Sequence, residues 1–214
     1  MTLSTTEQEQ QNTRRRQAWD KQANRYDRQI GWWERRLFGQ DNRAWAAQRA
    51  HGDVLEVAIG TGLNIPLYDA DVKLTGIDLS PEMLDIARKR AAEADRAIDL
   101  REGDAHKLAF DDESFDTVVC TFSLCNIPDP HQALTEMQRV LRPGGHLVLV
   151  DHIRSTTKPI YWLQKGIEVI SVRIDGDHMT RRPSQIVEKL GFDILERDRF
   201  RRGIVERLVA TKPA

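Results

Sequence analysis

The chain has 214 residues and a formal net charge of −1, because 32 lysines and arginines nearly offset 33 aspartates and glutamates. This length suits one α/β domain with a substantial core and is too short for two. The neutral balance argues against a broad basic surface for nucleic acid. There is no run of about eighteen apolar residues that would span a bilayer, and no apolar signal segment at the start, so we expect a cytoplasmic protein.

The first fifty residues are polar at first and then rich in tryptophan. Residues 1–13 contain mainly Thr, Gln and Glu and are predicted to be disordered. Residues 15–50 predict two helices, interrupted near Gly31 and Gly39, and contain four of the five tryptophans. Most of these rings should pack against the rest of the protein, and the functional alternative is a mobile aromatic lid. The chain is therefore divided into a tail (1–13), a helical N-terminal lid (14–50) and a ligand-binding domain (51–214).

Beyond residue 50, apolar segments alternate with amphipathic segments, which predicts a parallel sheet with helical connections. The predicted strands are 53–58, 72–78, 98–102, 116–122 and 146–151, with a final strand pair at 192–199 and 204–211. The predicted helices begin at Pro81, cover 131–141 and 158–173, and begin again near Pro183. Ser80 is expected to cap the first of these helices, and Gly144-Gly145 to close the second.

The most informative motif is a glycine turn after the first strand, Val54 to Asn64, which is followed by Asp78 at the end of the second strand. In doubly wound α/β proteins such glycines let the backbone approach a nucleotide, and the acid accepts hydrogen bonds from ribose hydroxyls. A dinucleotide fingerprint would have a third glycine where this chain has Ile65, and Pro66 lacks an N–H for a pyrophosphate. The turn therefore argues against a nicotinamide or flavin enzyme.

Three further segments follow in order: Gly103–Phe110, Ser114–Cys120, and Leu141–Val150, which begins Leu-Arg-Pro-Gly-Gly. With the glycine turn, this series resembles class I S-adenosylmethionine-dependent methyltransferases over residues 15–212. The chain is most similar to the ubiquinone/menaquinone-type branch, with relatives that methylate phospholipids and thiols. One difference is Ala58, where that family usually has glycine.

The resemblance implies a Rossmann-like, doubly wound α/β fold. Its mostly parallel seven-stranded sheet would have an antiparallel last strand, and a helical N-terminal lid would cover the cofactor. It also implies S-adenosyl-L-methionine as the cofactor, bound at the carboxyl ends of the strands. Residues 51–214 would form the S-adenosylmethionine-binding methyltransferase domain.

Individual cofactor contacts follow from the same resemblance. Glu56 would hold the methionine part, Asp78 the ribose, and Asp104 the adenine amino group beside the backbone N–H of Ala105. The remaining expected contacts are Tyr26, Ala58, Gly60, Thr61, Gly62, Asn64, Leu79, Met83, Thr121 and Phe122. The structural alternative is an ion pair elsewhere for Glu56, since a buried charge needs a partner, and helix packing for Met83.

The sulfonium is already activated, so a thiol or phenol acceptor needs little beyond orientation and desolvation. A carbon acid or a neutral hydroxyl needs a base. The two candidate bases are His152, directly after the fifth strand, and His178, in the loop at 175–181; a structural role is the alternative for each. Weaker candidate bases are Asp151, His131 and Tyr26. Cys125 and Asn126 are expected to form part of the pocket wall. His106 and His146 are discounted because they are expected to lie far from the carboxyl ends of the strands. The cysteine and histidine spacings predict no metal site.

The expected function is transfer of a methyl group from S-adenosylmethionine to a small-molecule or lipid-like acceptor by in-line displacement. One alternative is a phospholipid N-methyltransferase at the membrane surface, with peripheral contact through the N-terminal tryptophans and arginines. The others are a nicotinamide-dependent oxidoreductase, a nucleic-acid methyltransferase, and a catalytically silent cofactor-binding subunit. The sequence identifies neither the acceptor nor the atom that is methylated. A monomer or homodimer with no nucleic-acid partner is expected.

Overall fold

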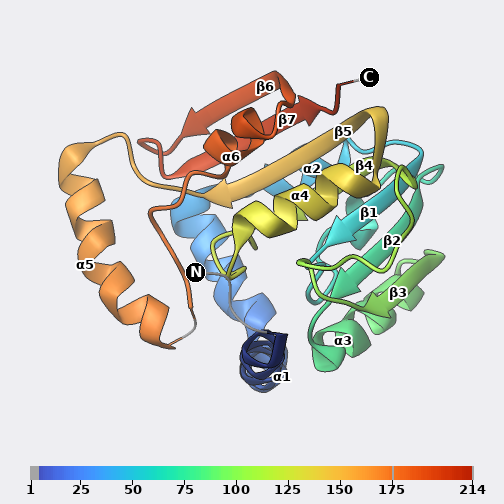
Figure 1. Cartoon of the computed structure of the whole chain (residues 1–214). Coiled ribbons are helices and arrows are strands. Elements are labelled where there is room, and N and C mark those ends of the chain that lie inside the picture. Colours follow the sequence, from blue (N-terminus) through green and yellow to red (C-terminus); the bar gives the residue numbers. More distant parts are fainter. Residues whose placement is uncertain (1–4, 175, 214) are drawn as a thin grey trace.

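The computed structural model describes residues 5–174 and 176–213, which form a seven-stranded sheet with helices on both faces (Figure 1). The strands are β1 (Asp53–Val57), β2 (Lys73–Asp78), β3 (Ile98–Glu102), β4 (Phe115–Thr121), β5 (Leu141–His152), β6 (Asp193–Phe200) and β7 (Val205–Thr211). Their order across the sheet is β3-β2-β1-β4-β5-β7-β6. Strands β1 to β5 are parallel, and β7 pairs antiparallel with both β5 and β6. The expected doubly wound sheet with an antiparallel last strand is therefore confirmed.

Two hydrophobic clusters lie on opposite faces of the sheet, because successive side chains of a strand point to opposite sides. One cluster includes Val54 of β1 and contains residues of α2 (Asn42–Ala47) and α3 (Pro81–Glu93). The other includes Leu55 and contains residues of α4 (Pro130–Val140) and α6 (Pro183–Lys189). Because both faces of the sheet are covered, β1 and β4 are buried along almost their whole length.

The strand order reverses between β1 and β4, because β1 is followed by β2 on one side and the chain later returns to pair β4 on the other. Ligands of open α/β sheets bind in the crevice at the carboxyl ends of strands at such a reversal. Helix α3 begins at the same edge: the Ser80 hydroxyl accepts a hydrogen bond from the Met83 N–H at 3.2 Å. The predicted N-cap is confirmed, and its position brings a helix N-terminus next to Asp78.

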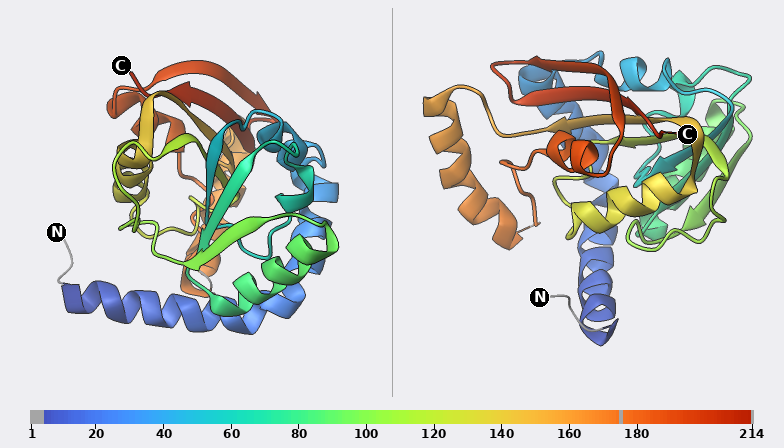
Figure 2. Two further views of the ribbon diagram at one scale, coloured as in Figure 1. Left: turned by 90° about the vertical axis from the view of Figure 1, so that its right-hand side faces the viewer. Right: turned by 45° about the horizontal axis from the view of Figure 1, so that its top comes forward.

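The N-terminal segment differs from the two predicted helices. Helix α1 (Thr5–Trp33) is continuous through Gly31 and passes directly into a π-helical turn, η1 (Glu34–Phe38). The interruption occurs only at Gly39, whose φ of 95° is in the left-handed region that favours glycine. Residues 5–13, expected to be disordered, form the first turns of α1; residues 1–4 lie outside the described residues. Figure 2 shows α1 running beside α3, with its first turns extending beyond the rest of the molecule.

The second departure concerns the Leu-Arg-Pro-Gly-Gly segment. The glycines do not close a helix: α4 ends at Val140, and β5 begins at Leu141 with a register shift against β4. A Cβ on Gly145 would lie 2.8 Å from the carbonyl oxygen of Arg142 and 3.0 Å from that of Asp116. The segment therefore passes close to its neighbour strand as a bulge, which requires glycine. The other predicted strand bounds agree with the structure to within one residue.

A long helix, α5 (Lys158–Ile174), follows β5 and stands apart from the sheet at one end of the molecule (Figure 1). Among the described residues, none of α5 belongs to either hydrophobic cluster. A search of the same residues finds no helix with the length and apolar character needed to cross a membrane.

Candidate functional site

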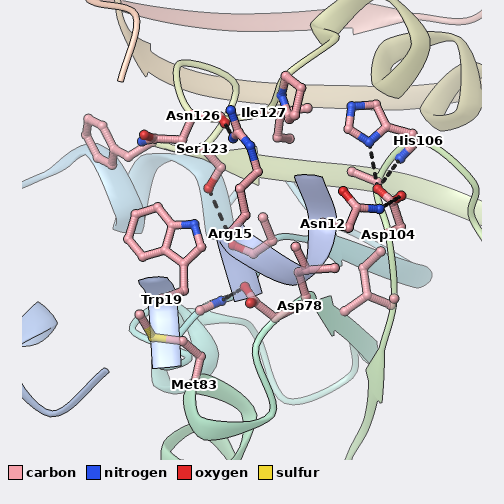
Figure 3. Close-up of a pocket in the computed structure, with 18 of the residues that line it drawn as sticks. Asn12, Arg15, Trp19, Asp78, Met83, Asp104, His106, Ser123, Asn126 and Ile127 are labelled. Carbon is pink, nitrogen blue, oxygen red and sulfur yellow. Dashed lines mark hydrogen bonds and ion pairs between the residues drawn. The ribbon is translucent and has the colours of Figure 1, made fainter. Parts of the chain in front are cut away.

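A pocket lies at the carboxyl ends of β1, β2, β3 and β4, around the reversal of strand order (Figure 3). Nine predicted cofactor residues line it: Tyr26, Ala58, Gly60, Asp78, Leu79, Met83, Asp104, Ala105 and Phe122. The other five are buried and do not line the pocket: Glu56, Thr61, Gly62, Asn64 and Thr121. The structure thus brings together residues from four strand ends, as a ligand site of this fold requires. Their contacts to a cofactor remain a prediction.

The loop after β1 has three left-handed residues, and each has a different environment. Gly60 has no atom within 4 Å of the position a Cβ would take, so its missing side chain leaves open space for a ligand to approach. At Gly62 a Cβ would lie 2.4 Å from Ile65 Cδ1, so this glycine is required for packing. Ala58 has a φ of 56°, a conformation that costs a non-glycine residue roughly 1–2 kcal/mol. Alanine at this family glycine position is therefore strained as well as bulkier.

Asp78 holds the glycine loop and faces the pocket at the same time. Its Oδ2 accepts the Gly60 N–H at 2.8 Å, and its Oδ1 accepts the Ser80 N–H at 2.9 Å. Burial raises the pKa of Asp78 to about 6, against the hydrogen bonds from these two backbone groups, which lower it. The side chain is a positioned acceptor with lone pairs left for ligand hydroxyls.

The turn after β3 forms the next part of the wall. Asp104 accepts hydrogen bonds from the His106 backbone N–H at 2.9 Å and from the Asn12 side chain at 2.6 Å, and its Oδ1 lies 2.7 Å from His106 Nδ1 (Figure 3). Burial raises the pKa of Asp104, but these hydrogen bonds outweigh it and hold the pKa below its usual range.

His106, discounted from the sequence as distant, lines the pocket. That expectation was wrong because the residue follows the carboxyl end of β3 by only four positions, at the same edge of the sheet as the other strand ends. His146 does lie away from the pocket, at the start of the regular part of β5, where its ring meets His51.

Glu56 is the centre of a buried polar network behind the pocket wall. It accepts hydrogen bonds from Asn64 Nδ2 at 2.7 Å and from the Tyr68 hydroxyl at 2.9 Å. Burial raises its pKa to about 7, against Tyr68, Arg43 and Asn64, which lower it. This network satisfies Glu56 without a ligand, so its expected contact with the methionine part remains a prediction, and Thr121 joins the same network through Asn64 at 3.0 Å.

Arg43 is a component of this network that the sequence did not reveal. Its guanidinium donates to Asn64 Oδ1 at 3.2 Å and to Glu34 Oε1 at 2.7 Å, and it lies over the Phe122 ring. Its Nη2 atom is buried and has no hydrogen-bond partner. The only available sequence signal was an arginine next to the apolar run Ala44–Ala47, which resembles an ordinary helix edge. A buried, incompletely paired guanidinium can bind an anionic group of a ligand.

Helix α1 supplies the fourth side of the pocket. Asn12, Arg15, Trp19 and Tyr26 all line the pocket, and Figure 3 shows Asn12 and Trp19 among the strand-end residues. The Trp19 and Tyr26 rings meet edge to face, with centroids 6.1 Å apart. The spacing of these four residues puts them on one face of the helix, a signal that was present in the sequence. Of the four, only Tyr26 was predicted.

Polar contacts attach α1 to the rest of the protein along its length. Near its start, Asn12 is bound to Asp104, and the Arg15 guanidinium donates to the backbone carbonyl of Asn126. Further along, the Ser80 hydroxyl donates to Asp20 at 2.5 Å.

Toward the C-terminal end of α1, Asp27 Oδ1 accepts a hydrogen bond from Thr61 Oγ1 at 2.5 Å. Arg90 forms an ion pair with the same carboxylate. Thr61 therefore connects the glycine loop to α1.

The two candidate bases occupy different environments. His152 is buried at the end of β5, and its Nε2 lies 3.3 Å from Asp177 Oδ1. Burial lowers the pKa of His152, but Asp177 and Asp151 outweigh it and raise the pKa to about 9. His178 is half-buried, with Nδ1 3.7 Å from Glu168, and burial together with Arg181 lowers its pKa. Neither histidine lines the pocket itself.

An aromatic ring connects His152 to the pocket. Phe38 stacks on His152, with centroids 5.5 Å apart and planes at 20°, and on Phe122, at 5.5 Å and 23°. Trp33 stacks on Phe38 at 6.4 Å, and Trp32 contacts Trp33 edge to face at 4.7 Å. The rings form a continuous aromatic path from the exposed tryptophans to Phe122 and His152.

The remaining candidates have structural explanations. Asp151 accepts the backbone N–H groups of Cys125 and His152, at 3.1 and 2.8 Å, so it stabilises the loop after β4. His131 is exposed in the first turn of α4. Cys125 Sγ, a ring nitrogen of His152 and a carboxylate oxygen of Asp177 lie within 4.8 Å of one another, close enough to share a cation. Within this group His152 and Asp177 form an ion pair at 3.3 Å. The expectation of no metal site remains a prediction.

Comparison with known proteins identifies the family to which the chain belongs. A family model described as a methyltransferase domain matches residues 55–149. Phosphatidylethanolamine N-methyltransferase of Cereibacter sphaeroides is 44% identical over 118 residues, which cover 54% of this chain and 58% of that protein. Demethylmenaquinone methyltransferase of Deinococcus radiodurans is 44% identical over 115 residues, covering 51% and 48%. The chain thus spans about half the length of these two relatives.

Longer matches cover most of the chain. Human thiol S-methyltransferase TMT1A is 30% identical over 178 residues, which cover 80% of this chain and 72% of that protein. A solved S-adenosylmethionine-dependent methyltransferase structure from Thermotoga maritima has a TM-score of 0.69 at 23% identity, covering 92% of this chain and 99% of that one. The resemblance stated from the motifs is confirmed: the chain belongs to the class I S-adenosylmethionine-dependent methyltransferases.

Proposed function

We propose that this chain transfers a methyl group from S-adenosylmethionine to an apolar, small-molecule or lipid-like acceptor. The observation that carries the proposal is the continuity of the site. A nucleotide-type pocket, with Asp78 at its glycine loop and Asp104 at its far wall, leads to Phe122 and from there to Phe38 and His152. In this proposal the donor occupies the pocket and the acceptor lies against the aromatic rings beside it.

The pocket residues support a specific placement of the cofactor. Asp78 would accept the ribose hydroxyls, while Leu79, Met83 and Asp104 would surround the adenine. Arg43 does not line the pocket, but it has an unpartnered Nη2 and lies over the pocket residue Phe122, so we assign it to the methionine carboxylate. Glu56 would act through Asn64, whose side-chain amide it accepts, by fixing the wall behind the methionine part.

The chemistry asked of the protein is modest. The methyl group moves in line from the sulfonium to the acceptor, which leaves S-adenosylhomocysteine, and any acceptor proton must be removed. His152 would take that proton, with Asp177 holding the imidazole. Helix α1 would exclude water from the pocket and orient both reactants, which is where most of the acceleration arises.

The aromatic path favours an apolar acceptor over a polar one. Trp32 and Trp33 are about half exposed, at 48% and 44%, and lead inward through Phe38 to the site. A flat ring or an acyl chain would be stabilised along this path. The Cereibacter sphaeroides and Deinococcus radiodurans relatives are named for phosphatidylethanolamine and demethylmenaquinone, which supports a lipid-like acceptor here.

The direct test of function is an acceptor screen with isotope-labelled S-adenosylmethionine, read by mass spectrometry. Quinols, phospholipid amines, thiols and phenols are the acceptor classes to be screened. Labelled product from one of them, with S-adenosylhomocysteine formed in equal amount, is the expected result. Tight binding of a nicotinamide dinucleotide, without binding of S-adenosylhomocysteine, would overturn the proposal.

Replacing Asp78 with alanine is expected to weaken S-adenosylhomocysteine binding by about 1.5–3 kcal/mol for each charged hydrogen bond lost, or roughly ten- to hundredfold. The loss includes the support that Asp78 gives to the Gly60 N–H. Isothermal calorimetry measures the dissociation constant, and thermal unfolding checks the fold. Asp99→Ala is a matched control, because Asp99 is exposed on the neighbouring strand and pairs with Arg101. A dissociation constant for Asp78→Ala equal to that of the wild type would contradict the ribose assignment.

A further inference from the structure

Helix α5 has its polar and apolar faces reversed. A surface helix normally buries an apolar stripe and exposes polar residues. In α5 most of the side chains that face solvent are apolar, with exposed fractions of 69% for Trp162 and 60% for Ile170. The exposed apolar residues are Trp162, Leu163, Ile167, Val169, Ile170 and Val172. The side chains that face the protein include the polar residues Gln164, Glu168 and Ser171.

The inward polar contacts fix this orientation. Gln164 is buried, donates to the Ile153 carbonyl at 2.9 Å and accepts the Ser155 N–H at 2.8 Å. One turn further, Glu168 accepts a hydrogen bond from the Thr180 hydroxyl at 2.8 Å. Rotating the helix to bury its apolar face would break these hydrogen bonds. The exposed apolar face is therefore a specified feature of the fold.

The charges around this face have one sign. Lys158 and Lys165 are exposed on α5, and Arg154 is exposed just before it. Glu168 is the only acidic residue of the helix, and it is turned inward. An apolar face bordered by lysines complements an apolar layer beneath anionic headgroups. Two copies of α5 packed against each other would instead bring their lysines together.

We propose that α5 is a docking helix that lies in the surface of an anionic lipid bilayer, with Trp162, Leu163 and Ile170 in the acyl region. Figures 1 and 2 show α5 standing clear of the sheet at one end of the molecule, where a flat surface can reach it. A contiguous exposed apolar face of this kind marks an interaction site.

The docking helix is connected to the proposed active site by a short segment of chain. The chain leaves α5 and reaches Asp177, which contacts His152, within three residues of the end of the helix. Docking would therefore hold the acceptor end of the site beside the bilayer. This link to a lipid acceptor rests on the proposed function, whereas bilayer binding by α5 does not.

Vesicle flotation of the full chain tests the proposal without methyl transfer. The wild type should float with vesicles that contain phosphatidylglycerol and phosphatidylcholine, and much less with phosphatidylcholine alone or at high salt. The double variant Leu163→Glu/Ile170→Glu should lose vesicle binding by at least about tenfold. Lys158→Glu/Lys165→Glu should lose the preference for anionic vesicles. S-adenosylhomocysteine binding should be unchanged in both, which shows that they are folded.

The control variant is Leu195→Glu, because Leu195 is an equally exposed apolar residue, at 56%, on the edge strand β6. It should bind vesicles like the wild type. Failure of the wild type to float, or equal losses in the control and the α5 variants, would overturn the proposal. A dimer in sedimentation that the α5 substitutions abolish, without vesicle binding, would assign this face to a second copy instead. None of these outcomes depends on whether the chain methylates a lipid.

Discussion

Replacing His152 with alanine is expected to lower turnover by about 10²–10⁴-fold while S-adenosylhomocysteine affinity stays unchanged. His152 stacks on Phe38 beside the pocket wall and has Asp177 at 3.3 Å, and in the proposed function it removes the acceptor proton. The cofactor contacts proposed here lie on other residues. Single-turnover rates with a saturating acceptor, together with calorimetry, separate the chemical step from binding.

The pH dependence of turnover by the wild type is an independent check of the role of His152 as a base. His152 has a pKa raised to about 9 by Asp177 and Asp151, so it is protonated at neutral pH and only its neutral form can accept a proton. Turnover should therefore increase with pH until about 9 and then level off. Asp177→Asn removes the larger of these influences, and the inflection should shift to lower pH. A rate that falls through this range would mean that His152 acts as a cation.

His178→Ala is the matched control, because His178 is half-buried and directed at Glu168. It should change turnover far less than His152→Ala. Full activity in both variants would mean that catalysis here depends on orientation alone. That result would favour an acceptor that ionises easily, such as a thiol.

The sheet could be predicted from sequence because its signals are local. Apolar runs in β1 and β4, the glycine turn and the Ser80 cap each determine one element within a few residues. The predicted start of β5 was wrong, because long-range contacts determine the backbone conformation there. Gly145 looked like a helix terminator, but the close approach to Asp116 places it in a strand bulge.

Only part of the candidate site could be predicted from the sequence. Residues at strand ends, such as Asp78 and Asp104, follow from the topology, since parallel strands end at one edge. Arg15, Trp19 and Arg43 reach the site from helices before the first strand, and their position depends on how those helices dock. No local pattern specifies that docking. Helix α5 shows the converse: its bounds were predicted to within one residue, but the exposure of its apolar side chains, such as Leu163 and Ile170, was not.

Deleting residues 1–24 is expected to lower turnover by at least about 10²-fold and to weaken S-adenosylhomocysteine binding without abolishing it. The deletion removes Asn12, Arg15 and Trp19 from the pocket wall and lets water reach the methyl group. It keeps Tyr26 and the core residue Phe38, so the domain should fold. Thermal unfolding, calorimetry and single-turnover rates are the measurements.

Two point variants distinguish a lid from a merely stabilising helix. Asp20→Ala breaks the contact to Ser80 next to the pocket and should raise the acceptor KM and lower kcat. Arg16→Ala removes an ion pair with Glu102 whose side chains are 41% and 46% exposed, so it should have little effect, as exposed ion pairs contribute little. If the deletion and Asp20→Ala both leave kcat unchanged while lowering the melting temperature, α1 stabilises the fold but does not close the site. A fall in kcat with the melting temperature of Asp20→Ala preserved would identify α1 as the part of the chain that completes the pocket for methyl transfer.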